Sequence, residues 1–127
     1  MEPLQVSAVG QAQDGVAVLS VAGELDYGTE RVLGDAAQRL LDQGCRRLIV
    51  DCAGLAFCDS QGLNRFLQLR LDLESRDGLL VLAAISSPLR HVLELTDALQ
   101  IFVLADSVEA ALRSAGPGGA CVRGPAA

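Results

Sequence analysis

The 127-residue sequence predicts a single α/β domain in which helices cover a mixed β-sheet. Three observations indicate this class. Short runs of Val, Leu and Ile alternate along the chain with segments whose apolar residues recur at helical spacing. Turn-forming pairs such as Asp14-Gly15 and Asp77-Gly78 separate the segments. Half of the residues are hydrophobic but only 3% are aromatic, so we expect an aliphatic core.

The first half of the chain is predicted to contain two strands, a helix and a third strand. Residues 4–9 and 16–21 form a hairpin. Gly23-Glu24-Leu25-Asp26 is predicted as a break, and a helix follows over residues 29–43. Residues 47–52 form a strand without polar alternation, which is typical of a strand covered on both faces.

The second half continues the alternation, which gives the order β-β-α-β-α-β-α-β-α. A helix with Leu63, Phe66, Leu67 and Leu71 at core spacing leads to a buried strand over residues 79–84. A short helix then starts at Ser87-Pro88, with Ser87 as its cap and the proline at the first helical position. Residues 101–104 form the last strand. The sequence Asp106-Ser107-Val108-Glu109 resembles a capping box that opens a helix to about residue 114.

Residues 1–115 are therefore expected to form the domain. Residues 116–127 are rich in glycine and proline and are expected to form a flexible tail.

Charge and composition exclude several functions. The formal net charge is −6, and the chain contains arginine but no lysine. An acidic domain gains nothing from counterion release, so direct binding to DNA or RNA is not expected. No run approaches the roughly 20 apolar residues of a membrane span, and the N-terminus lacks the pattern of a secretory signal. We therefore expect a cytoplasmic protein without a membrane association.

The cysteines and the histidine do not form a metal-binding pattern. Cys45, Cys52, Cys58 and Cys121 include no Cys-x-x-Cys pair, and His91 is the only histidine. The first three cysteines are expected to be small core residues. Cys121, in the predicted tail, would be the reactive one through its exposure. No metal or other cofactor is expected.

The candidate site is the segment FCDSQGL, residues 57–63, which follows a buried strand. Asp59 or Ser60 could simply cap the next helix. Gly62 fits that interpretation poorly, because glycine in a helix costs up to roughly 1 kcal/mol unless something approaches the backbone closely. Alternatively, Ser60 could carry a phosphate that the free N–H groups of the helix start would stabilise. The surface would then gain up to two negative charges beside Asp59. From these residues alone both interpretations stay open.

Catalysis is not expected at this segment. A serine hydrolase would need a Gly-x-Ser-x-Gly elbow and a usable histidine, but Ser60 follows Cys58-Asp59 and His91 is predicted on the outer face of the third helix. A receiver domain would need a lysine. Asp51 and Asp59 are two loose carboxylates and only a weak signal for a metal.

The segment LIVDCAGLAFCDSQGL, residues 48–63, resembles the signature of the STAS-domain anti-sigma factor antagonists. In that signature a hydrophobic strand ends in Asp, and a small-residue loop and an aromatic residue precede Asp-Ser-Ser-Gly-Leu. Gly23-Glu24-Leu25-Asp26 resembles a second landmark of the family. Ser87-Pro88 followed by Val92-Leu93-Glu94-Leu95-Thr96 is similar to its third helix. The resemblance covers about residues 4–114.

This resemblance implies a partner-switching regulator of transcription. When unphosphorylated, such a protein binds an anti-sigma factor, usually a serine kinase with a GHKL-type ATPase fold, and thereby frees a sigma factor. The kinase phosphorylates the serine after the motif's Asp, here Ser60, and a serine phosphatase reverses the reaction. Asp26, Asp59, Ser60, Gln61 and Gly62 would then form the partner-binding site. The chain would bind no ATP itself.

One departure from the family pattern leaves an alternative open. Gln61 stands where the family has a second serine, so Ser60 is the only hydroxyl of the motif. The chain could instead be a STAS scaffold or ligand-binding module, for example for a nucleotide, without a phosphorylation cycle. Replacing Ser60 with Asp or Ala distinguishes the two hypotheses, because only the switch should respond.

Overall fold

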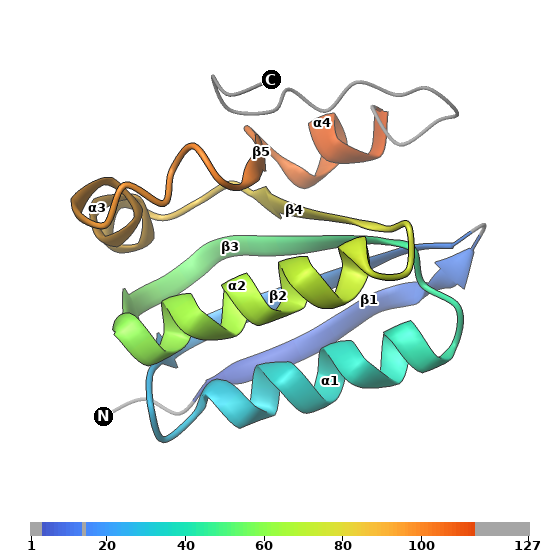
Figure 1. The fold of residues 1–127 in the computed structure, drawn as a ribbon, viewed down its shortest axis with the longest axis horizontal. Coiled ribbons are helices and arrows are strands. Elements are labelled where there is room, and N and C mark those ends of the chain that lie inside the picture. The colour runs from blue at the N-terminus through green and yellow to red at the C-terminus, as the bar shows by residue number, and fades with distance from the viewer. Residues whose placement is uncertain (1–3, 14, 114–127) are drawn as a thin grey trace.

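The computed structural model describes residues 4–13 and 15–113. Within them the elements follow the predicted order (Figure 1): β1 Gln5–Gln13, β2 Val16–Leu25, α1 Glu30–Asp42, β3 Arg47–Cys58, α2 Ser60–Glu74, β4 Leu79–Ala83, α3 Ser87–Leu95, β5 Val103–Ala105 and α4 Val108–Arg113. The predicted tail, residues 116–127, and Cys121 within it lie outside the described residues, so the domain boundary at residue 115 stays a prediction.

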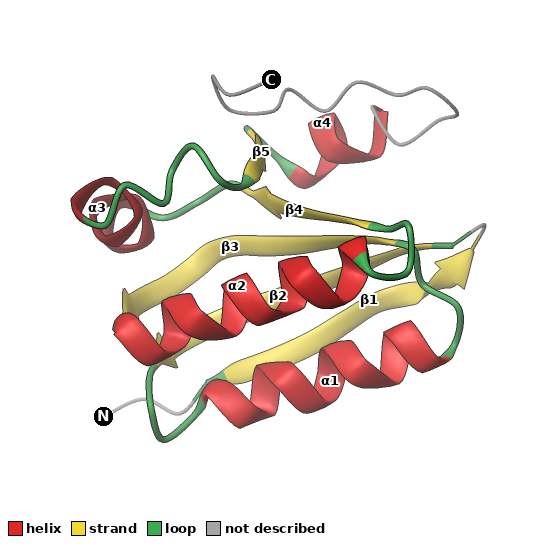
Figure 2. Cartoon of the chain, in the orientation of Figure 1, coloured by secondary structure: helices red, strands yellow, loops and turns green. Residues whose placement is uncertain are grey.

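The strands form one mixed sheet in the order β1-β2-β3-β4-β5. β1 is antiparallel to β2, and the other neighbouring pairs are parallel. Helices α1 and α2 lie side by side on one face of the sheet, and α4 lies on the other face (Figure 2). The predicted α/β architecture is therefore confirmed, and the parallel strands β2 and β3 end at the same edge of the sheet.

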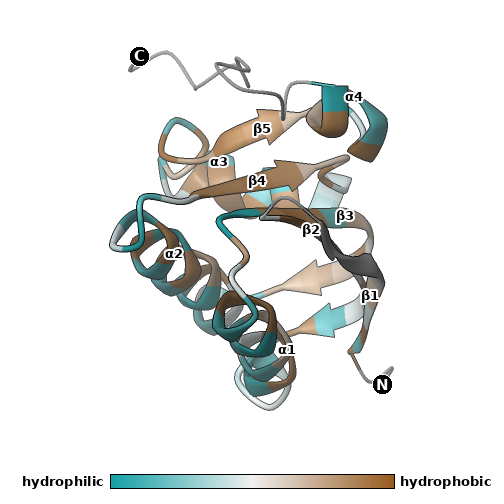
Figure 3. Ribbon diagram, turned by 90° about the vertical axis from the view of Figure 1, so that its right-hand side faces the viewer, coloured by the Kyte–Doolittle hydropathy of each residue, from teal (hydrophilic) through white to brown (hydrophobic). Residues whose placement is uncertain are grey.

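Two hydrophobic clusters flank the sheet, one on each face. The larger cluster packs strand residues such as Leu48 and Val50 against α1, α2 and α3. The smaller cluster places Ile49 and neighbouring strand residues beside Ala111 of α4. Successive residues of a strand point to opposite faces, so β3 must be apolar at every position here. In Figure 3 strands β4 and β5 are brown, because they are hydrophobic along their length. Helices α1 and α2 have mixed colours, because only one side of each helix faces the core.

Three strands extend further than their sequence patterns predicted. β1 runs to Gln13 and not only to residue 9. β2 continues through Gly23 and Glu24 to Leu25, where a break was predicted. β3 runs to Cys58 and not only to residue 52. The pairing of β2 and β3 shifts register twice on the way, and Gly23 has a φ of 104°. These irregularities interrupt the two-residue period that identifies a strand, although the ladder continues.

The predicted caps of two helices are wrong by one position. Ser86, and not Ser87, caps α3, because the Ser86 hydroxyl accepts a hydrogen bond from Leu89 N at 3.4 Å. Ser107 accepts from Ala110 N at 3.0 Å at the start of α4, so the predicted capping box does not begin at residue 106. In both helices a serine in extended or turn conformation precedes the first helical turn.

The core face of α2 also differs from the prediction. Leu63 and Phe66 are buried as expected, but Leu71 is 54% exposed. Leu69 and Leu73 fill the core in its place. The helix is leucine-rich on more than one side, so spacing alone could not select the buried row.

Candidate functional site

The candidate site lies where β3 ends and α2 begins. Asp59 has an extended backbone with φ −100° and ψ −172°, and its carboxylate accepts a hydrogen bond from Gly62 N at 2.9 Å. Asp59 is therefore the cap of α2, and the interpretation of Ser60 as the cap is wrong. Ser60 is the first helical residue and is exposed, and its hydroxyl makes no hydrogen bond to the residues that the structure describes.

Gly62 allows α2 to approach the end of β2. It is buried, and a Cβ at this position would lie 2.6 Å from the carbonyl oxygen of Leu25 and 2.9 Å from the sulfur of Cys58. The same carbonyl of Leu25 accepts a hydrogen bond from Asp59 N at 3.1 Å. The close approach that Gly62 indicated is thus made by this chain's own strand. A direct role of Gly62 in partner binding stays a prediction.

The loop between β2 and α1 lies beside the start of α2. Tyr27 N donates a hydrogen bond to the second oxygen of the Asp59 carboxylate at 3.3 Å. Asp26 accepts from Gly28 N at 2.9 Å and from Thr29 N at 3.1 Å. The structure therefore brings Asp26 and Asp59 to one end of the sheet, and both carboxylates hold backbone amides there. Gln61 is exposed beside Ser60.

Replacing Asp59 with alanine should lower the free energy of unfolding by about 1–2 kcal/mol, because it removes the acceptor of Gly62 N. Asp59→Asn keeps an amide oxygen for Gly62 N and should cost clearly less. Urea denaturation of both variants measures the difference. Equal stability of the wild type and Asp59→Ala would contradict the capping role.

Sequence reasoning missed one residue of this site, Tyr27. It is 80% exposed, whereas Phe66 and Phe102 are at most 1% exposed and contact each other edge to face. Phe57, at the end of β3, is 46% exposed. The available signal was the position of Tyr27, between the predicted break at residues 23–26 and the predicted helix.

The buried cysteines of the domain are poorly suited to act as nucleophiles. Cys45, Cys52 and Cys58 are buried free thiols, as predicted. Burial and, to a smaller extent, the nearby Asp59 charge together raise the pKa of the Cys58 thiol to about 12. Burial also raises the pKa of the Cys52 and Cys45 thiols. Neutral thiols are poor nucleophiles at physiological pH.

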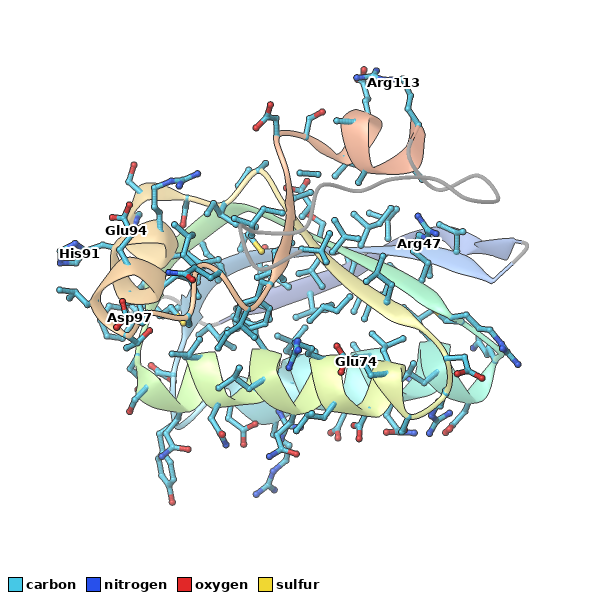
Figure 4. The ribbon with its side chains drawn as sticks, turned by 45° about the horizontal axis from the view of Figure 1, so that its top comes forward. Arg47, Glu74, His91, Glu94, Asp97 and Arg113 are labelled. Carbon is cyan, nitrogen blue, oxygen red and sulfur yellow. The ribbon has the colours of Figure 1, made fainter. Side chains whose placement is uncertain are left out.

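Other candidate chemistry is not assembled in the described residues. No group of three His, Cys, Asp or Glu side chains there is arranged to hold a metal ion. His91 is exposed on α3 and points away from the domain (Figure 4). In the described part of the chain, no helix combines the length and hydrophobicity that a bilayer span requires.

The fold and the site together define a small binding domain, and comparison with known proteins identifies its class. Residues 8–111 match the model of the STAS domain, so the chain belongs to the STAS domain family. This confirms the family predicted from the three sequence landmarks.

Within that family, the chain is similar to anti-sigma factor antagonists. The relative named "Putative anti-sigma factor antagonist BtrV", from Bordetella bronchiseptica, is 31% identical over 98 residues, which are 77% of this chain and 84% of the relative. The crystal structure of an anti-sigma factor antagonist from Mycobacterium paratuberculosis has a TM-score of 0.75 and 25% identity, and the match covers 87% of this chain and 92% of that one.

The Bacillus cell fate determinant SpoIIAA, solved in its phosphorylated form, shares the fold with a TM-score of 0.63 and 24% identity, over 87% of this chain and 97% of that one. By homology and fold the chain therefore belongs with the anti-sigma factor antagonists. Proteins of this family are binding proteins and not enzymes, and this chain is classed with them.

Proposed function

We propose that this chain is an anti-sigma factor antagonist that is controlled by phosphorylation of Ser60. In its unphosphorylated form it binds an anti-sigma factor, a serine kinase of the GHKL ATPase type, and so frees a sigma factor in the cytoplasm. The kinase phosphorylates Ser60 and a serine phosphatase reverses the change. The partner-binding surface includes Asp26, Asp59, Ser60 and Gln61, with Gly62 beneath them.

The observation that carries this proposal is the hydroxyl of Ser60. It lies at the first position of α2, it is exposed, and the capping task is performed by Asp59. Among the described residues, the Ser60 hydroxyl therefore has no structural role that would explain why a serine stands at this position. The first N–H groups of a helix lack acceptors within the helix, so a phosphate on Ser60 would find donors close by.

A phosphate at Ser60 should change the surface and leave the fold intact. It adds up to two negative charges next to the Asp59 carboxylate. The start of α2 is fixed by Gly62 against Leu25, so the helix has little freedom to move away from the new charge. The solved phosphorylated form of SpoIIAA, which has the same fold, supports this expectation by analogy. A partner that docks closely over the helix start would then be obstructed by the phosphate, whose charges would have to lose their hydration at the interface.

The test is affinity capture from lysate of the native host with four immobilised proteins: wild type, Ser60→Ala, Ser60→Asp and Ser87→Asp. Ser87 is a matched control, because it is likewise an exposed serine at the first position of a helix. Wild type, Ser60→Ala and Ser87→Asp should capture a protein with a GHKL-type ATPase domain. Ser60→Asp should retain about tenfold less of it, because the added carboxylate must lose its hydration where the partner packs closely over the helix start.

The captured kinase then allows a direct assay. With ATP it should phosphorylate the wild type at Ser60, as located by peptide mass spectrometry, and leave Ser60→Ala unmodified. Capture of the same proteins by wild type and Ser60→Asp would refute the switch and favour the STAS scaffold without a phosphorylation cycle.

A further inference from the structure

Tyr27 combines high exposure with a position beside Ser60. It is the single tyrosine of the chain and has the largest exposed fraction, 80%, among the large hydrophobic side chains that the structure describes. Its backbone amide is bonded to Asp59, the residue that precedes Ser60. Tyrosine contributes a large apolar area and a polar tip, and it is enriched at the centres of protein interfaces.

The loop that carries Tyr27 is held at each of its amides. Asp26 N donates to the Thr29 hydroxyl at 3.0 Å, and Tyr27 N donates to the Asp59 carboxylate at 3.3 Å. Gly28 N and Thr29 N donate to the Asp26 carboxylate at 2.9 and 3.1 Å. An exposed aromatic ring on a loop that is already ordered loses little further entropy when a partner covers it.

The charge around Tyr27 is predominantly negative. Residues 22–29 and 53–64 meet at this end of the sheet, where Glu24 of β2 pairs with Phe57 of β3. These two segments contain the carboxylates of Glu24, Asp26 and Asp59 and no arginine. The first basic residues after them are Arg31 and Arg65, and Arg65 is paired with Glu30 at 2.6 Å. A complementary surface is therefore positively charged, and an arginine guanidinium can stack on a tyrosine ring.

We propose that Tyr27 is the aromatic anchor of the partner interface, and that it is covered by a positively charged, arginine-bearing surface of the anti-sigma factor. Asp26 and Asp59 are then also positioning residues, which hold the loop of Tyr27 in addition to contributing their negative charge. The proposal takes the class of partner from the proposed function, but it does not depend on phosphorylation of Ser60.

The test begins with capture by wild type, Tyr27→Ala and Leu112→Ala from the same lysate and continues by calorimetry with the purified partner. Leu112 is a suitable control, because it is 45% exposed on α4, which lies on the opposite face of the sheet from α1 and α2. Tyr27→Ala should weaken binding by about tenfold or more, as expected of an interface anchor, with an unchanged melting temperature. Tyr27→Phe and Leu112→Ala should bind nearly as the wild type does. Binding should weaken as salt concentration rises.

The positioning role has its own readout. Asp26→Asn keeps the side-chain oxygen that accepts from Gly28 N and Thr29 N but removes the charge, whereas Asp26→Ala removes both. If Asp26 also positions the loop, Asp26→Asn should lose only the charge attraction, whereas Asp26→Ala should lose clearly more affinity. Equal losses in both variants would show a direct charge contact with the partner and overturn the positioning role.

The remaining outcomes separate this proposal from the proposed function. If Tyr27→Ala loses the partner and Ser60→Asp keeps it, the anchor stands and the phosphorylation switch fails. If Ser60→Asp loses the partner and Tyr27→Ala keeps it, the anchor is refuted and the switch stands. Three further results would each overturn the proposed occupant. These are binding that does not respond to salt, the absence of any captured partner, and sedimentation experiments in which the chain associates with itself through Tyr27.

Discussion

Replacing Gly62 with alanine is expected to lower the free energy of unfolding by about 1–3 kcal/mol, the usual range for an overpacked core site. The added Cβ would lie 2.6 Å from the carbonyl oxygen of Leu25 and 2.8 Å from its Cγ. The carbonyl belongs to the ladder between β2 and β3, so it cannot move without disturbing the sheet. Either α2 shifts outward or the end of β2 does, and the candidate site is distorted in both cases.

Urea denaturation measures this effect, and Gly28→Ala is the matched control. A Cβ at Gly28 would meet only an oxygen of Asp26, at 3.5 Å, which is an ordinary contact. Gly28→Ala should therefore unfold close to the wild-type midpoint. A Gly62→Ala protein as stable as the wild type would show that α2 and β2 do not approach as closely as described.

Alkaline pH should destabilise the domain through its buried thiols. The pKa of Cys58 is raised by burial from 9.0 to about 12, and the pKa of Cys52 is raised by the same cause. Above pH 9 the unfolded chain releases these protons while the native state retains them, so deprotonation favours unfolding. The stabilising contribution is complete below pH 9, falls as pH rises further, and for Cys58 is exhausted near pH 12. Two such thiols should cost about 3 kcal/mol between pH 9 and pH 10.5.

This chain is well suited to the measurement, because it contains no lysine whose titration would overlap with that of the thiols. Denaturant titrations at pH 8, 9 and 10.5 give the dependence of the unfolding free energy on pH. Cys58→Ala removes one of the buried thiols and should clearly reduce the slope, whatever its effect at pH 8. A slope unchanged by that substitution would mean that the Cys58 thiol does not carry the effect.

The order of the elements could be predicted because its signals are local. Asp77-Gly78 and similar pairs mark the turns, and uninterrupted apolar runs such as Leu48-Ile49-Val50 identify strands with two covered faces. The lengths of β2 and β3 could not be predicted in the same way. The register of their pairing shifts near Ala22 and Gly23, so the alternation of inward and outward residues is interrupted in the sequence. Only the hydrogen bonds to the neighbouring strand show that both strands continue.

The candidate site was predictable in its residues but not in their contacts. The motif identified Asp59, Ser60 and Gly62, and it indicated that something approaches Gly62 closely. That this neighbour is Leu25, more than thirty residues away in the sequence, is a tertiary fact without a local signal. The exposure of Tyr27 was also hidden, because a scarce aromatic residue in an aliphatic protein is expected in the core.

The close packing of Gly62 against the end of β2 affects how fast the protein can respond to phosphorylation. Under the proposed function, adding or removing a phosphate at Ser60 requires no rearrangement of the domain, because the helix that carries the serine is already fixed to the sheet. The response time of the regulator is then set by the turnover of the kinase and phosphatase and by the dissociation of the partner. Each round of phosphorylation and dephosphorylation restores the same surface, so the binding properties of the protein do not depend on its earlier modifications.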